Sequence, residues 1–141
     1  MATSDLASLR NAKLQAFITQ LGGSAIARLY SGTRPGGGPS AAATGTLLAT
    51  LTFGSTNALD ANGGTAGSVT GGVLTLGGYT QTAGSHVAGT PGYVRFLTSG
   101  GTAIRDVDVT ASAIAGNIQF NGTVATGTPI TGAITFTDGD V

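Results

Sequence analysis

The chain has 141 residues and no cysteine, and its six basic residues balance six acidic ones, so the formal net charge is zero. The absence of cysteine excludes a disulfide framework and a thiolate metal site. Only 9% of the residues are charged, and the basic ones are scattered, so no strip suited to tracking phosphates of a nucleic acid is visible.

The length is that of one domain. With so few charges, the surface must consist mainly of threonine, serine, glycine, asparagine and alanine, and copies of such a surface repel one another only weakly. This composition favours a protein that works packed among neighbours. No apolar run approaches the roughly 20 residues that span a bilayer, and the start of the chain lacks the pattern of a signal peptide. We therefore expect neither a membrane protein nor a membrane partner.

A helix is expected first. Ser4 or Thr3 can cap it, Asp5 suits its first turn, and Gly22-Gly23 stops it. Its second half carries a clean apolar stripe at helical spacing, formed by Leu14, Phe17, Ile18 and Leu21.

The first half of this helix has a mixed face, because basic residues share one side with leucines. We interpret residues 1–23 as a helical arm whose second half packs on its own domain. The first half either projects toward another protein or is a fraying surface helix with snorkelling basic side chains. If it projects, the expected protein-contact residues are Leu6, Leu9, Arg10 and Lys13.

After the double glycine the apolar period changes from 3.6 to 2, which predicts short strands throughout residues 24–141. Strands are expected at 25–30, 47–53, 73–76, 92–97, 103–109, 117–120 and 133–136. The 25 glycines concentrate between these strands, in long loops at 31–46, 54–72 and 77–91, the first of which we expect to be flexible. About seven short strands with such turns predict a mainly β fold, namely an antiparallel β-sandwich or jelly roll.

No catalytic constellation is recognisable. His86 is the single histidine and has neither an orienting acid nor a nucleophile elbow nearby in sequence, so we interpret it as an exposed loop residue. The pairs Asp106/Asp108 and Asp138/Asp140 lack the spacing of a calcium loop, and we interpret them as solvated acids. We therefore predict no catalytic residue, no cofactor and no metal site, and we do not expect an enzyme.

One order of motifs is distinctive. The helix segment Leu-Arg-Asn-Ala at 9–12 leads to Leu-Tyr-Ser-Gly-Thr-Arg-Pro at 29–35 and then to Leu-Leu-Ala-Thr-Leu-Thr-Phe at 47–53. This order resembles a family of small structural proteins of tailed bacteriophages and prophages, and the match covers residues 9–53. Further along, Tyr-Val-Arg-Phe at 93–96 resembles that family's Trp-Phe-Arg strand, with the tryptophan replaced, and an aspartate–valine strand follows at 106–109 in the expected order.

The resemblance implies a virion structural protein without enzymatic activity, and it carries over no site residue because the shared motifs are structural. The leading expectation is a capsid decoration or cement protein, made in the bacterial cytoplasm and bound to the outside of the phage head. Its partners would be the major capsid protein or other virion proteins, and it would form a homo-oligomer. A neck, tail or fibre-base component is the first alternative. An adhesive or carbohydrate-binding β-sandwich is a remote one, because the sequence offers no clear aromatic platform.

Overall fold

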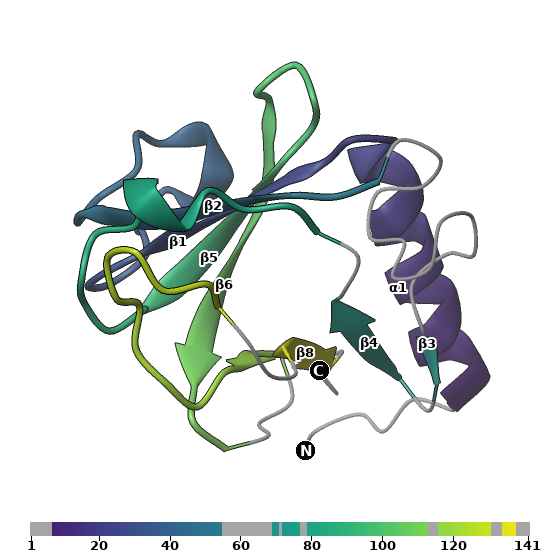
Figure 1. Cartoon of the computed structure of the whole chain (residues 1–141). Coiled ribbons are helices and arrows are strands. Elements are labelled where there is room, and N and C mark those ends of the chain that lie inside the picture. Colours follow the sequence, from purple (N-terminus) through teal and green to yellow (C-terminus); the bar gives the residue numbers. More distant parts are fainter. Residues whose placement is uncertain are drawn as a thin grey trace.

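The computed structural model describes residues 7–54, 69–70, 72–76, 79–112, 116–130 and 134–137. These residues form one α-helix, two short 3-10 turns and eight strands (Figure 1). The elements in chain order are α1 (Ala7–Leu21), β1 (Ile26–Tyr30), η1 (Gly38–Ser40), β2 (Leu47–Thr52), β3 (Val69–Thr70), β4 (Val73–Leu76), η2 (Ala83–Ser85), β5 (Tyr93–Leu97), β6 (Ala103–Thr110), β7 (Ile118–Gln119) and β8 (Ile134–Thr137).

The helix ends where the sequence predicts. Gly22 adopts the left-handed conformation, with φ of 71°, and its N–H still donates to the carbonyl oxygen of Ile18 at 3.2 Å. Glycine takes this conformation without the steric cost that a Cβ would add, which is why it closes helices so often. The expected apolar stripe is confirmed, because all four of its members are buried, namely Leu14, Phe17, Ile18 and Leu21.

The strands form one sheet in the order β2-β1-β5-β6-β7-β8-β4-β3. Its described neighbours pair antiparallel except β6 and β7, which pair parallel through Val109 and Ile118. The sheet curls so far that its two ends approach each other. Thr52 at the end of β2 exchanges two backbone hydrogen bonds, of 3.0 and 2.8 Å, with Thr80, which follows β4.

The mainly β expectation is therefore confirmed, and each strand expected from the alternating pattern is present within a residue or two. The short β3 lies within residues 54–72, where the sequence predicts a loop. The described strands form a single curled, mixed sheet, a half-barrel, which does not by itself demonstrate the sandwich or jelly roll that we expected.

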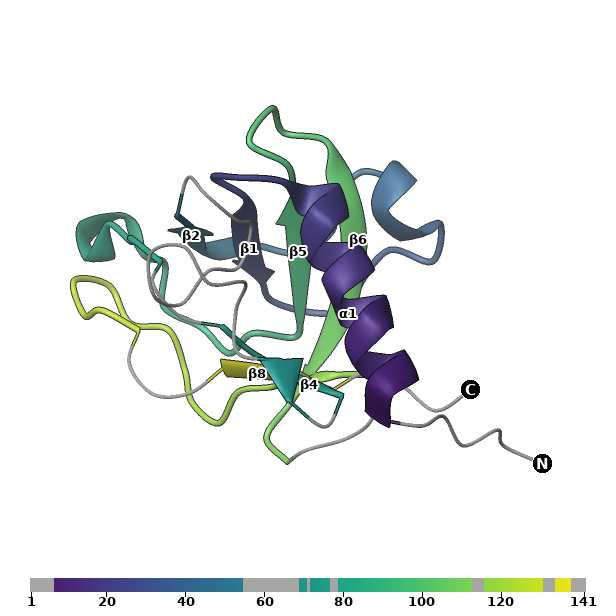
Figure 2. The same cartoon turned by 90° about the vertical axis from the view of Figure 1, so that its right-hand side faces the viewer.

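The core lies inside the curl and joins the helix to the sheet. Phe17 of α1 places its ring edge-on to Phe96 of β5 and to Phe136 of β8, with centroids 5.2 and 6.0 Å apart. The Arg105 guanidinium covers the Phe136 ring at 4.8 Å, a cation–π contact that lets a cation border the core. Figure 2 shows α1 reaching from β5 and β6 at one end to β4 at the other. Helix and sheet share one hydrophobic core, as expected for the second half of the helix.

Among the described residues, no helix combines the length and the apolar character needed to cross a membrane.

Candidate functional site

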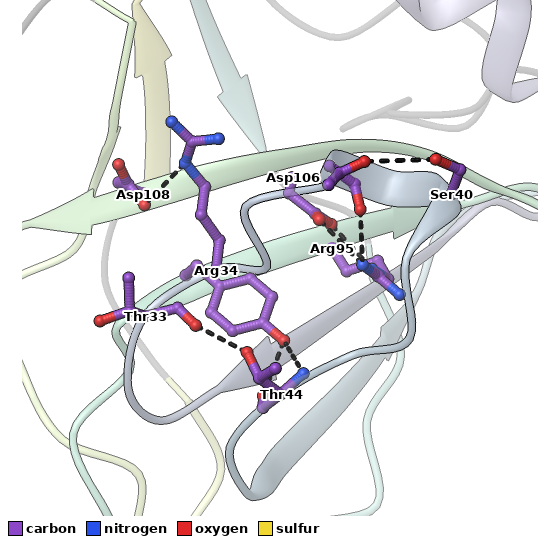
Figure 3. Close-up of polar contacts among 10 residues, drawn as sticks. Thr33, Arg34, Ser40, Thr44, Arg95, Asp106 and Asp108 are labelled. Carbon is purple, nitrogen blue, oxygen red and sulfur yellow. Dashed lines mark hydrogen bonds and ion pairs between the residues drawn. The ribbon is translucent and has the colours of Figure 1, made fainter.

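The outer face of β5 and β6 carries a group of charged side chains, and the structure uses them to hold a loop (Figure 3). Arg95 and Asp106 face each other across the two strands. Nε of Arg95 donates to Oδ1 of Asp106 at 2.7 Å, and a terminal guanidinium nitrogen donates to Oδ2 at 2.9 Å. The two side chains are only 7% and 1% exposed. The hydrogen bonds to Asp106 raise the pKa of Arg95 above its ordinary value and outweigh the opposing effect of burial.

Our interpretation of Asp106 as a solvated acid is therefore wrong. The reason is that residues 31–46 fold over this face and exclude water from it. Arg95 also donates to the carbonyl oxygen of Gly38 in that loop at 3.4 Å. Asp108 is nearer to the expectation, since its side chain is 44% exposed, yet it too forms an ion pair, with Arg34 at 3.1 Å.

The loop at 31–46 is tied down at its far end as well. The Tyr93 hydroxyl donates to the carbonyl oxygen of Thr44 at 2.7 Å and accepts from its N–H at 3.0 Å. The Tyr93 ring stacks on Tyr30 with centroids 5.1 Å apart. Gly45 and Gly92 allow close backbone approaches here, because an added Cβ would overlap the carbonyl oxygens of Ser31 and Gly32. The prediction of a flexible loop is therefore wrong for residues 31–46, because hydrogen bonds and ion pairs fix it to β5 and β6.

His86 does not occupy the exposed position that we predicted, since it is only 3% exposed. It follows the 3-10 turn η2, and its Nδ1 lies 3.1 Å from the carbonyl oxygen of Thr128. A carbonyl oxygen only accepts, so Nδ1 carries the proton, and in the neutral ring Nε2 is then an acceptor. Nε2 is buried and has no hydrogen-bond partner. No acid or nucleophile among the described residues is hydrogen-bonded to this ring.

His86 lines the one sizeable groove that this part of the chain shares with the edge strand β2. The groove encloses about 500 Å³ between β2 and residues 80–87. Its lining comprises Leu47, Leu48, Ala49, Thr50, Thr52, Thr80, Gln81, Thr82, Ser85, His86 and Val87. His86 apart, none of these side chains is ionisable, so the groove suits an uncharged occupant. Sequence reasoning missed it because η2, which opens it, leaves no mark in a glycine-rich segment.

The expected contact residues of the first helical half have different surroundings. Leu9 is 48% exposed, and Lys13 is exposed too. Arg10 is half-buried and packs against Gly72, where an added Cβ would meet its side chain at 2.8 to 3.1 Å. The neighbouring Asn11 accepts a hydrogen bond from the Gly72 N–H at 2.8 Å. Leu6 lies outside the described residues. The helix is thus fastened to the β3–β4 hairpin from Arg10 onward, and Leu9 and Lys13 remain accessible.

Within the described residues, no three histidine, aspartate or glutamate side chains gather as a metal site. The aspartates at 138 and 140 lie outside the described residues. Comparison of the chain with protein-family models, with curated proteins and with solved structures found no match.

Proposed function

We propose that this protein is a structural component of a tailed-phage particle, and specifically a decoration or cement protein of the head. The proposal rests on the position in the fold of the two motifs that carry the resemblance. The Leu-Tyr-Ser-Gly-Thr-Arg-Pro segment forms the end of β1 and the start of the fixed loop, and Leu-Leu-Ala-Thr-Leu-Thr-Phe forms β2 and its exit. A family held together by such motifs shares a building block rather than a catalytic centre.

The charges support the same proposal. Of the twelve charged residues in the chain, Arg34, Arg95, Asp106 and Asp108 are engaged with one another on one face. The other eight charged residues are few for a chain of 141 residues and the net charge is zero, so charge repulsion between copies is weak, and the sequence is otherwise rich in hydroxyl groups and glycine. Such a surface tolerates dense packing on a shell and association into a homo-oligomer.

In this proposal the exposed part of α1 contacts the major capsid protein. Leu9 supplies apolar area and Lys13 supplies a charge on the same half of the helix. Burying apolar area contributes about 25 cal/mol per Å² before the cost of ordering. Many copies that each bridge neighbouring capsid subunits would strengthen the shell against the pressure of packaged DNA.

We also propose that the curled sheet is an open form of the sandwich expected from the sequence. Its two halves face each other across a small apolar space. Ala27, Leu29, Leu51 and Val94 line that space from one side, and Leu76, Ile118 and Ile134 line it from the other. This shared apolar space supports the proposal, because the inner faces of a sandwich also enclose a common core.

Reconstitution tests the proposal. Particles of the encoding phage are prepared from a strain that lacks this gene, and purified protein is added to them. The proposal predicts saturable binding over the whole head surface, visible by electron microscopy, and heads that release their DNA at a higher temperature than undecorated heads. Binding only at the tail vertex would favour a neck, tail or fibre-base protein instead. No binding to any part of the particle would refute a virion role.

A further inference from the structure

The groove beside β2 lies between two points at which the backbone of this strand is hydrogen-bonded to the segment at 80–87. Thr52 pairs with Thr80 in antiparallel fashion. If the ladder continued, Thr50 would pair with Thr82 and Leu48 with Gly84. Instead, the N–H of Val87 donates to the carbonyl oxygen of Leu48 at 2.9 Å. Val87 lies three positions beyond Gly84, and the extra residues are taken up by η2, which carries the chain away from β2.

The gap exposes the backbone of Thr50. The N–H and C=O of Thr52 point away from β1, since both bond to Thr80. Directions alternate along a strand, so the N–H and C=O of Thr50 also point away from β1 and into the gap. Among the described residues no hydrogen bond reaches either group. An unpaired donor and acceptor on an edge strand form a template for another extended backbone.

The second, independent observation is that Nε2 of His86 lacks a hydrogen-bond donor. His86 lines the groove, whereas Thr128, which holds its Nδ1, does not. The two nitrogens of an imidazole face different sides of the ring, so Nε2 is on the side turned from Thr128. Because Nδ1 carries the proton, this buried Nε2 offers a lone pair, and it has no partner. A buried acceptor without a partner is destabilising, because it has lost its hydration and nothing replaces it.

The rim of the groove is apolar at the end where Val87 bonds to Leu48. Leu47 and Val87 are 38% and 45% exposed, and they are two of the three large hydrophobic side chains exposed among the described residues. Isolated exposed apolar residues are ordinary, but two at the mouth of one groove provide contacts for the side chains that flank a bound backbone.

We infer that this groove binds a short, extended and uncharged peptide segment of a partner protein by adding it to the edge of β2. The segment's backbone pairs with the N–H and C=O of Thr50. Nε2 of His86 is covered in the free protein, so binding shifts the residues that cover it, and a serine, threonine, asparagine or glutamine side chain of the segment then donates to it. Leu47 and Val87 contact the apolar residues on either side. An uncharged segment is required because no lining side chain would neutralise a charge in the groove. The inference does not depend on the proposed place of the protein in a virus particle.

A titration followed by nuclear magnetic resonance tests this inference on the full-length chain labelled with ¹⁵N. The probe is the capped peptide acetyl-Gly-Val-Thr-Val-Gly-amide, and its matched controls replace the central threonine with valine or with lysine. The threonine peptide is expected to shift the amide resonance of Thr50 and the Nε2 resonance of His86 together. The valine peptide keeps the shape but lacks the donor, so it is expected to bind about tenfold more weakly, and the lysine peptide at least as weakly.

Two variants locate the binding. Thr50→Pro removes only a backbone donor that faces the groove, so the pairing of β2 with β1 stays intact, and it is expected to weaken binding about tenfold. Thr50→Ala keeps the N–H and is expected to bind as the wild type does. Because Val87 is exposed, Val87→Asp tests the same groove without loading the core, and it is also expected to weaken binding about tenfold.

The inference is overturned if the threonine peptide moves neither resonance, or if Thr50→Pro and Val87→Asp both bind as the wild type does. It is also overturned if a neutral oligosaccharide such as maltotriose shifts both resonances and the peptides do not. A ¹⁵N shift that shows Nε2 already hydrogen-bonded in the free protein, unchanged by every peptide, would also overturn the inference.

Discussion

Arg95 and Asp106 form a two-pronged ion pair across β5 and β6, in which both side chains are almost fully shielded from water. The pair also fastens the loop at 31–46, because Arg95 reaches the carbonyl oxygen of Gly38. A buried charge with a bidentate partner is strongly coupled to that partner, whereas an exposed pair is screened by water. Strand β6 contains one acid of each kind, two residues apart: Asp106 forms the buried pair and Asp108 forms the exposed one.

Replacing Asp106 is expected to be far more destabilising than replacing Asp108. Asp106→Ala leaves the Arg95 guanidinium buried without its counter-charge, which is expected to cost about 3 to 5 kcal/mol of unfolding free energy. Asp108→Ala breaks an ion pair whose partners are 46% and 44% exposed, and it is expected to cost at most about 1 kcal/mol. Urea unfolding followed by circular dichroism measures both. Equal losses for the two variants would contradict the structural account of this face.

The close approach of Gly92 to Gly32 predicts a second large effect. A Cβ at Gly92 would overlap the carbonyl oxygen of Gly32, which is backbone and cannot rotate away. Gly92→Ala is therefore expected to destabilise the fold by about 3 kcal/mol. Gly36→Ala in the same loop is the matched control, because a Cβ there meets nothing within 4 Å, and it is expected to change stability by less than about 0.5 kcal/mol. Thermal unfolding distinguishes the two, and a Gly92→Ala protein as stable as the control would show that this approach is absent.

The sequence predicted the elements well because their signals are local. The apolar spacing from Leu14 to Leu21 identified the buried face of α1, and the apolar pattern identified all strands except β3, which lies in a glycine-rich stretch without such a pattern. What it missed depends on contacts between distant segments. The Arg95–Asp106 pair requires the register of β5 against β6, and the burial of His86 requires the 120–130 segment that supplies Thr128. Neither is visible in a glycine-rich sequence.

The groove illustrates the same limit. Its lining residues come from β2 and from residues 80–87, and their composition is that of any polar loop. Only the pairing of Thr52 with Thr80, followed by the bond from Val87 to Leu48, shows that the ladder is interrupted. A sequence pattern carries no record of such an interruption.

Tyr79 predicts a loss of stability in alkali. Its ring packs edge-on to Phe53, with centroids 5.8 Å apart, and burial raises the pKa of its hydroxyl above the ordinary 10.0. The folded state therefore holds the neutral phenol more tightly than the unfolded state does. This contribution is fully present below the unfolded pKa and is lost as the pH rises through the folded one.

Urea unfolding at about pH 8 and about pH 11 checks this effect. Wild-type protein is expected to lose more stability between the two conditions than Tyr79→Phe, because the variant has no hydroxyl to ionise at this position. The difference between the two proteins removes the contributions of the other tyrosines. If both lose the same amount, the Tyr79 hydroxyl is solvated in the folded state.

A substitution at Leu9 tests binding to the head without a large effect on folding. Because it is 48% exposed, Leu9→Ser is expected to change the unfolding free energy by less than about 0.5 kcal/mol while lowering the number of copies bound per head in the reconstitution. Leu14 lies on the buried face of the same helix at 1% exposure, and Leu14→Ala is expected to cost about 3 kcal/mol of stability. A Leu9→Ser protein that decorates heads as well as wild type does would exclude this part of α1 from the contact.

The copy number of the protein in purified particles tests most directly the proposal that it decorates the phage head. Quantitative mass spectrometry, with labelled peptides of this chain and of the major capsid protein as standards, measures the ratio of the two. We predict a ratio of the same order as one to one, constant across particle preparations. A count that matches only a single ring at the tail vertex, or the absence of the protein from particles, would contradict the account.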